Sequence, residues 1–236
     1  MDTRKIVKTK GIVLAETNFS EADKMLTILT PDLGKISCVA KGARRMGNKL
    51  MATSQVFAFC DLVLYRGNGL TYYINSAELI EAFYPLRVDY DKLDCAMSCI
   101  TFMKKNIQEN QTSVPILKLL LNTIYLLAEG SKNYELVKNI YELKGVCLLG
   151  YSPRVANCVE CGSKDIIGFS MKKNGMVCNN CGIIDKSLIR MLPGTIAAIR
   201  YIVQSDLKKL FSFNVTDEII KELQFFNKIY IKEKLE

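Results

Sequence analysis

The sequence predicts an α+β protein in which a small N-terminal β-barrel is followed by helices and a cluster of four cysteines. Three observations support this prediction. Five short runs rich in β-branched, aromatic and aliphatic residues fill about the first eighty positions. Apolar residues then recur at three- and four-residue spacing, which is typical of helices. Two Cys-x-x-Cys pairs lie between the helical stretches.

Residues 1–82 are predicted to form the barrel. Turn-forming residues, among them Pro31 and Gly34, separate the runs that we expect to be strands. These runs are residues 5–17, 24–30, 34–41, 55–67 and 70–80. Five strands in so short a segment favour a closed or nearly closed barrel, with an OB-fold as the first choice and a small SH3-like barrel as the alternative.

Two segments, residues 83–154 and 187–236, are predicted to be the two parts of an α-helical domain. Their periodicity predicts helices over residues 91–108, 114–130, 133–150, 193–210 and 216–235. Gly130 and Gly150 are suitable helix ends, and Pro193 lies near a helix start.

The charge is unevenly distributed. The net charge is +8, and residues 1–50 hold ten Lys or Arg against five Asp or Glu. The segment "KGARRMGNKL", Lys41 to Leu50, has four cationic side chains and no acidic one. Unpaired buried cations are costly, so this loop is expected at the surface. There it is either simply solvated or binds a polyanion.

Other features limit the function classes. Residues 1–13 have no apolar signal core, and the longest apolar stretch, residues 116–128, is interrupted by Lys118 and Asn122 and is too short to span a membrane. We therefore expect a cytoplasmic protein. The chain has no histidine, no phosphate-binding G-x-x-x-x-G-K-[ST] loop and no G-x-S-x-G motif. A binding protein without enzymatic activity is the expectation.

The two cysteine pairs have the spacing of a four-cysteine zinc site. The predicted ligands, with sixteen residues between the pairs, are Cys158, Cys161, Cys178 and Cys181. Gly162 and Gly182 follow the pairs and are expected to adopt positive φ. We predict one structural zinc per chain in a ribbon of residues 155–186. Nearby lysines are expected to offset part of the negative charge of the zinc with its four thiolates. A four-thiolate iron site and a thiol-redox role remain open.

In their order, the barrel with "KGARR", the helices and the approach "LLGYSPRVANCVECG" resemble the RecO family of bacterial DNA repair proteins, which are recombination mediators. The resemblance covers the chain, most densely over residues 10–46 and 145–182. It implies an OB domain joined to a helical domain that carries the zinc ribbon. It also implies a nucleoid-associated protein that binds single- and double-stranded DNA and anneals complementary strands without nucleotide hydrolysis. The implied partners are RecR, single-stranded DNA-binding protein and, indirectly, the RecA recombinase.

The resemblance carries Lys41, Arg44 and Arg45 over as the basic DNA-binding loop, and Lys49 and Lys35 complete the predicted set. Relatives often follow the arginines with proline, lysine or serine, where this chain has Met-Gly-Asn at 46–48. An OB barrel normally adds aromatic side chains on which bases stack. The candidates for that role are Tyr65, Tyr72 and Tyr73, of which strand alternation turns some inward.

We therefore hypothesise a DNA-annealing recombination mediator. Two other classes remain as alternatives. A thiol-redox enzyme would show disulfide reductase turnover and hold no tightly bound metal. A zinc-ribbon transcriptional regulator would prefer one duplex sequence.

Overall fold

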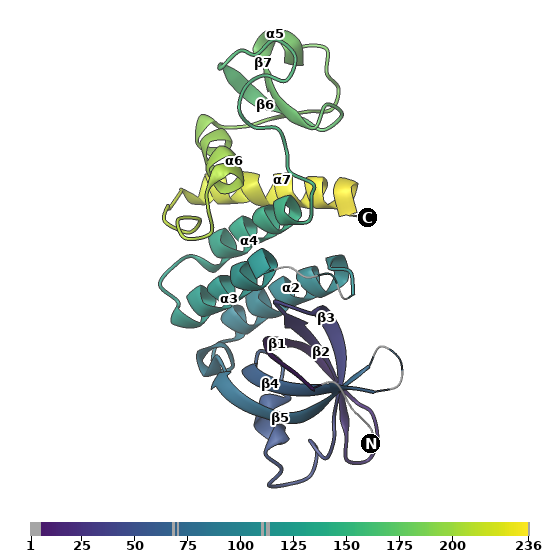
Figure 1. Cartoon of the computed structure of the whole chain (residues 1–236). Helices are drawn as coiled ribbons and strands as arrows, with labels where there is room; N and C mark the ends of the chain where they lie inside the picture. The colour runs from purple at the N-terminus through teal and green to yellow at the C-terminus, as the bar shows by residue number, and fades with distance from the viewer. Residues whose placement is uncertain (1–5, 68, 70, 110, 112–113, 236) are drawn as a thin grey trace. The chain divides into compact units, whose positions relative to one another are not determined.

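The computed structural model describes residues 6–67, 69, 71–109, 111 and 114–235, and it is an α+β protein. The chain forms two compact units, Met1–Glu129 and Gly130–Glu236. The first contains a barrel and helices, and the second contains helices and a small sheet (Figure 1).

In the described part of the first unit, five strands form a closed barrel in the order β1-β2-β3-β5-β4. The strands are β1 (Ile6–Asn18), β2 (Lys24–Thr30), β3 (Gly34–Ala40), β4 (Phe59–Arg66) and β5 (Tyr72–Glu81). Neighbours pair antiparallel except β3 and β5, which run parallel, and β1 pairs back to β4. The predicted strands are present, while Lys5 and Leu70 lie outside the described residues.

The barrel core consists of side chains that alternate inward along the strands. The buried cluster includes Val13, Leu26, Ile28, Ile36, Cys38, Cys60, Leu62, Leu64, Tyr72 and Ile74. After β3 the chain adds buried Ala43 to this cluster, and Leu50 at the start of α1 (Leu50–Thr53) packs against it. The segment that carries the basic loop is therefore anchored in the core at two points.

Helices of the first unit pack on the barrel. After the turn η1 (Tyr84–Leu86), α2 (Tyr90–Asn106) begins with Asp89, whose side chain accepts the backbone N–H groups of Asp91 and Lys92. Helix α2 contacts β1, and α3 (Val114–Glu129) contacts β2. The predicted boundary at residue 82 thus marks a change from strands to helices, whereas the compact unit continues to Glu129.

The second unit contains the cysteine-rich sheet and three longer helices in contact with one another. The helices are α4 (Tyr134–Leu148), α6 (Pro193–Gln204) and α7 (Asp217–Leu235). The sheet has the order β7-β6-β8, with β6 (Ile166–Ser170), β7 (Gly175–Cys178) and β8 (Leu188–Arg190), and α5 (Asn179–Gly182) follows β7. Phe169 of β6 makes edge-to-face ring contacts with Phe226 and Tyr230 of α7, which join the sheet to the helices.

One predicted helix was too long. Periodicity predicted a helix over 193–210, but α6 ends at Gln204. The Nζ of Lys144, which lies on α4, donates to the carbonyls of Ile202, Val203 and Ser205 at 3.2, 3.0 and 2.7 Å. This cation satisfies carbonyls at the helix end and favours termination there.

None of the helices in the described ranges combines the length and the apolar character that crossing a bilayer requires.

Candidate nucleic-acid interface and metal centre

The basic loop follows β3 directly and turns at two glycines. Lys41, Arg44, Arg45 and Lys49 are exposed, while Ala43 between them is buried. Gly42 and Gly47 have φ of 70° and 76°, which non-glycine residues rarely adopt. The buried alanine holds the backbone, so that these four cationic side chains face solvent.

Hydrogen bonds join this loop to the turn between β1 and β2. The N–H of Gly42 donates to Oδ1 of Asp23 at 2.7 Å, and the N–H of Arg44 donates to the carbonyl of Ala22 at 3.0 Å. Nη1 of Arg44 also donates to the carbonyl of Ser20 at 2.7 Å. Two polar loops are thus fastened together, so less conformational entropy is lost when they bind a ligand.

Asn48 shapes the part of the loop that departs from the usual family pattern. Its Oδ1 accepts the N–H of Leu50 at 2.7 Å. A Cβ built on Gly42 would lie 2.7 Å from its Nδ2, so the glycine allows the asparagine to lie close. The Met-Gly-Asn segment therefore forms an ordered turn that leads into α1, with exposed Lys49 at its end.

Lys35 is not grouped with the other predicted DNA contacts. It lies near the start of β3, six residues before Lys41, which corresponds to about 20 Å along a strand. Its Nζ donates to the carbonyl of Lys104 at 2.9 Å, near the end of α2. The structure gives Lys35 a partner within its own unit, and its role towards DNA stays a prediction.

The three tyrosines divide between the two faces of the barrel wall. Tyr72 is buried in the core cluster. Tyr65 and Tyr73 pair across β4 and β5 on the outer face, where their rings stack 5.2 Å apart with an interplanar angle of 11°. Nζ of Lys41 lies 5.2 Å from the centre of the Tyr73 ring, a cation–π contact that links this pair to the basic loop.

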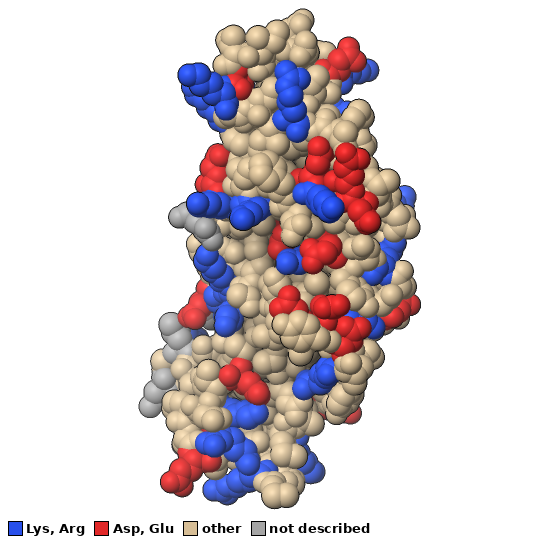
Figure 2. Space-filling view, turned by 180° about the vertical axis from the view of Figure 1, so that it is seen from behind, with Lys and Arg blue, Asp and Glu red and all other residues tan. Residues whose placement is uncertain are grey.

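Cationic side chains gather on the barrel, in the lower part of Figure 2. Two acidic side chains near the basic loop have partners, whereas Glu21 of the β1–β2 turn is exposed. Asp23 accepts the N–H of Gly42, and Glu16 pairs with Lys24 at 2.7 Å. The four cations of the loop outnumber the two carboxylates of the adjoining turn, Glu21 and Asp23, so the local field stays positive.

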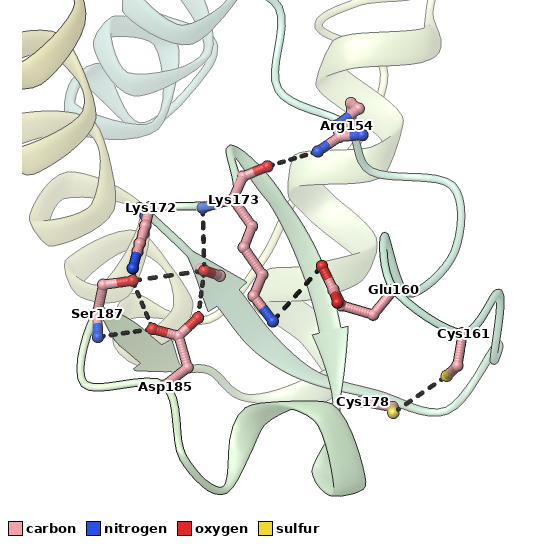
Figure 3. Close-up of polar contacts among 9 residues, drawn as sticks. Arg154, Glu160, Cys161, Lys172, Lys173, Cys178, Asp185 and Ser187 are labelled. Atoms are coloured by element: carbon pink, nitrogen blue, oxygen red, sulfur yellow. Dashed lines mark hydrogen bonds and ion pairs between the residues drawn. The ribbon is translucent and has the colours of Figure 1, made fainter.

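The four predicted metal ligands do come together in the second unit. The Sγ atoms of Cys158, Cys161, Cys178 and Cys181 all lie within 4.8 Å of one another. Sγ of Cys161 and Sγ of Cys178 are 3.6 Å apart (Figure 3). Four bonds of about 2.3 Å to a tetrahedral ion would place the sulfurs about 3.8 Å apart, whereas a disulfide needs about 2.05 Å. The cluster therefore fits a four-coordinate metal ion better than a pair of disulfides.

The turns that hold the sulfurs are only partly those expected. In the first turn the N–H of Gly162 donates to the carbonyl of Cys158 at 2.9 Å, and Gly162 has the predicted positive φ of 75°. The expectation for Gly182 was wrong, because this residue lies in α5 with helical backbone. Its lack of a side chain serves packing, since a Cβ there would lie 3.1 Å from Leu188.

The acidity of the thiols reflects their shared site. Burial raises the pKa of Cys158, but backbone N–H groups, led by that of Cys161, outweigh this and lower it to about 6. Hydrogen bonding with Cys161 and then with Cys178 raises the pKa of Cys181 to about 12. Without a cation, the first thiolate is stabilised and a further one is opposed. A bound dication favours deprotonation of all four.

Charged groups beside the cluster have ion-pair or hydrogen-bond partners (Figure 3). Nζ of Lys173 lies 3.5 Å from Oε1 of Glu160, and Nη2 of Arg154 donates to the carbonyl of Lys173 at 2.6 Å. Hydrogen bonds from Ser170 and then Ser187 lower the pKa of Asp185 to about 2. The lysines predicted to offset the metal site are Lys164, Lys172, Lys173 and Lys186. Lys173 is already paired with Glu160, whereas Lys172 and Lys186 are exposed.

The sequence reasoning placed a turn between β1 and β2 but assigned it no functional role. It contains exposed Phe19, and through Asp23, Ala22 and Ser20 it is the scaffold of the basic loop. The available signal was the position of the turn, because the loop between strands 1 and 2 of an OB barrel is a common oligonucleotide contact.

Similarity to known proteins extends over almost the whole chain. The family model "Recombination protein O N terminal" matches residues 1–83, and "Recombination protein O C terminal" matches residues 87–236. The DNA repair protein RecO of Acetivibrio thermocellus is 37% identical over 98% of this chain and 92% of its own length. That of Caldicellulosiruptor bescii is 36% identical over 98% and 94%, and that of Alkaliphilus metalliredigens is 33% identical over 98% and 94%.

Proposed function

Because the chain belongs to the RecO family of DNA repair and recombination proteins, we propose that it is a mediator that binds DNA, anneals complementary strands and helps to load RecA recombinase on single-stranded DNA. The observation that carries the proposal is the basic loop of Lys41, Arg44 and Arg45. Its cations are exposed, and its backbone is held by the barrel core and by the β1–β2 turn.

We infer that the barrel is an OB-fold. The strand order β1-β2-β3-β5-β4, with one parallel pair between β3 and β5, supports this over the SH3-like alternative. In such a barrel the face of strands 2 and 3, the loop between strands 1 and 2 and the loop between strands 4 and 5 are typical oligonucleotide surfaces. The basic loop lies directly after β3, beside the β1–β2 turn.

The proposed mechanism is electrostatic. Each Lys or Arg that contacts a phosphate releases condensed counterions, so binding depends strongly on salt and little on sequence. Two strands whose phosphates are neutralised on one basic surface repel each other less, which favours their annealing. No bond is made or broken, so we propose a protein without enzymatic activity.

For the four-cysteine cluster we propose one structural zinc per chain. Four sulfurs fill the tetrahedral coordination of Zn²⁺ and leave no open position for substrate or water. The ion would fasten the turn at Cys158 and Cys161 to the end of β7 at Cys178. Its contribution is folding energy for the ribbon.

The proposed partners follow from the family. They are single- and double-stranded DNA, RecR, single-stranded DNA-binding protein and, indirectly, RecA, in the bacterial cytoplasm at the nucleoid. The sharpest functional assay is annealing of complementary strands coated with single-stranded DNA-binding protein, with and without RecR.

The loop assignment is tested by charge reversal. Arg44→Glu/Arg45→Glu should weaken binding to a single-stranded oligonucleotide in a gel-shift titration by at least about tenfold, because two phosphate contacts become repulsive. Lys8→Glu/Lys10→Glu is the matched control, since it makes the same change in net charge with two exposed lysines of β1. Unchanged affinity in a folded arginine variant, or an equal loss in the control, would contradict the loop assignment.

A further inference from the structure

Phe19 is an exposed aromatic side chain in the turn between β1 and β2, with 60% of its surface accessible. A single exposed apolar side chain is ordinary on a protein surface and by itself indicates nothing. The position of Phe19 is informative because its turn is bonded to the basic loop.

Hydrogen bonds within the turn close it. The N–H of Phe19 donates to the carbonyl of Asp23 at 3.0 Å, and the N–H of Asp23 donates to Oγ of Ser20 at 3.1 Å. The guanidinium of Arg44 is bound to the carbonyl of Ser20, the residue next to Phe19. The Arg44 cation is therefore held against the backbone of the same short turn that carries the exposed ring of Phe19.

This pairing matches the repeating unit of a nucleic-acid strand, which carries a phosphate and a base in each nucleotide. A cationic groove that follows the phosphates, combined with aromatic rings on which bases stack, is the usual design of a single-strand site. In a duplex the bases are paired and stacked on one another, so a ring can use their faces only after unstacking them. Cations act on both forms of DNA, whereas an exposed ring acts on unpaired bases.

We propose that this surface binds single-stranded DNA more tightly than duplex DNA, and that Phe19 causes the difference by stacking on an unpaired base beside the phosphate that Arg44 contacts. The inference rests on the proposed DNA-binding function and adds to it a determinant of strand selectivity. Charge complementarity selects a nucleic acid as the occupant, because the loop that is hydrogen-bonded to this turn exposes Lys41, Arg44 and Arg45.

The first test compares affinities for a single strand and for a duplex of equal length. Phe19→Ala should lower the affinity for single-stranded DNA by about 5- to 150-fold, the range that corresponds to loss of one stacked base. Duplex affinity should stay within about twofold, and the slope of log affinity against log salt should not change, since no phosphate contact is lost. Tyr125→Ala, which removes an equally exposed ring (60%) from α3, should alter neither affinity.

A second test observes the ring directly. The chain has no tryptophan, so Phe19→Trp introduces a single tryptophan, a fluorophore that keeps an aromatic ring in place. Its emission should be quenched when oligo(dT) binds and should change little with a duplex. Tyr125→Trp is the matched control and should not be quenched by either DNA.

The outcomes separate the two levels of the proposal. Unchanged single-strand affinity of Phe19→Ala, or an unquenched tryptophan at position 19 in a protein that binds oligo(dT), overturns the stacking role alone. Equal losses on single strand and duplex overturn it too, because they indicate damage to the shared scaffold. Unchanged DNA binding with lost binding of RecR makes Phe19 a protein contact instead. If the unaltered protein binds no DNA, the proposed function itself fails.

Discussion

Lys144 is a single side chain on which the end of a helix depends. It is only 8% exposed, and its ammonium donates to three carbonyls at the end of α6. Lys144→Met keeps the apolar stem but leaves these carbonyls without their donor and removes a cation from the helix C-terminus. We expect the free energy of unfolding to fall by about 2–4 kcal/mol, measured by urea denaturation.

The control for this prediction is Lys228→Met, the same replacement at an exposed position of α7. It should change the free energy of unfolding by less than about 0.5 kcal/mol. Equal effects of the two replacements would show that the Lys144 hydrogen bonds add nothing to stability.

At the level of residues, the sequence predicted which side chains are exposed or buried better than it predicted their hydrogen-bond partners. The lack of acidic neighbours in "KGARRMGNKL" correctly predicted an exposed loop. Strand alternation correctly predicted that some of the tyrosines turn inward, and Tyr72 is the one. The partner of Lys35 could not be predicted, because the carbonyl of Lys104 is 69 residues away and reaches it only after α2 packs on the barrel. Asp23 was missed for the same reason.

The cysteine ribbon is the element whose stability should depend on metal. If zinc holds the turn at Cys158 and Cys161 against β7, a chelator should abolish hydrogen-exchange protection in β6, β7 and β8 and leave protection in the barrel strands. Cys178→Ser should have the same effect, and metal analysis should find one zinc per chain in the unaltered protein.

The matched control is Cys147→Ser. Cys147 lies on α4 outside the cluster, so this variant should keep its metal. Iron in place of zinc would support the four-thiolate iron site. Disulfide reductase turnover in protein that holds no metal would support the thiol-redox alternative.

Element types were predictable because periodicity is a local property, whereas element ends depend on contacts. The helical spacing identified α2, α3, α4 and α7 within a few residues. The end of α6 was missed because it is set by Lys144, from a different helix. The conformation of Gly182 was missed because a short helix, α5, replaces the expected turn after Cys181. The sulfur cluster itself was predictable, since ligand spacing alone encodes it.

For the whole molecule, the division into units was the least accessible to sequence reasoning. Residue 82 marks the change from strand to helix, and the two family models also divide there, at residues 83 and 87. A change of periodicity marks a new kind of element but does not show what the new element packs against. In the structure α2 contacts β1 and α3 contacts β2, so these helices belong to the barrel unit.

This division predicts how fragments behave. A fragment of residues 1–129 should unfold in one cooperative transition and keep its affinity for single-stranded DNA, because it contains the barrel, the basic loop and both covering helices. A fragment of residues 1–82 loses the helices that contact β1 and β2, together with the hydrogen bond from Lys35 to Lys104. Its melting temperature should be lower by more than about 10 °C, because losing even 2 kcal/mol lowers the melting temperature of a domain this small by about that much. Thermal unfolding followed by circular dichroism measures the difference, and equal melting temperatures would place the boundary of the folding unit at residue 82 instead.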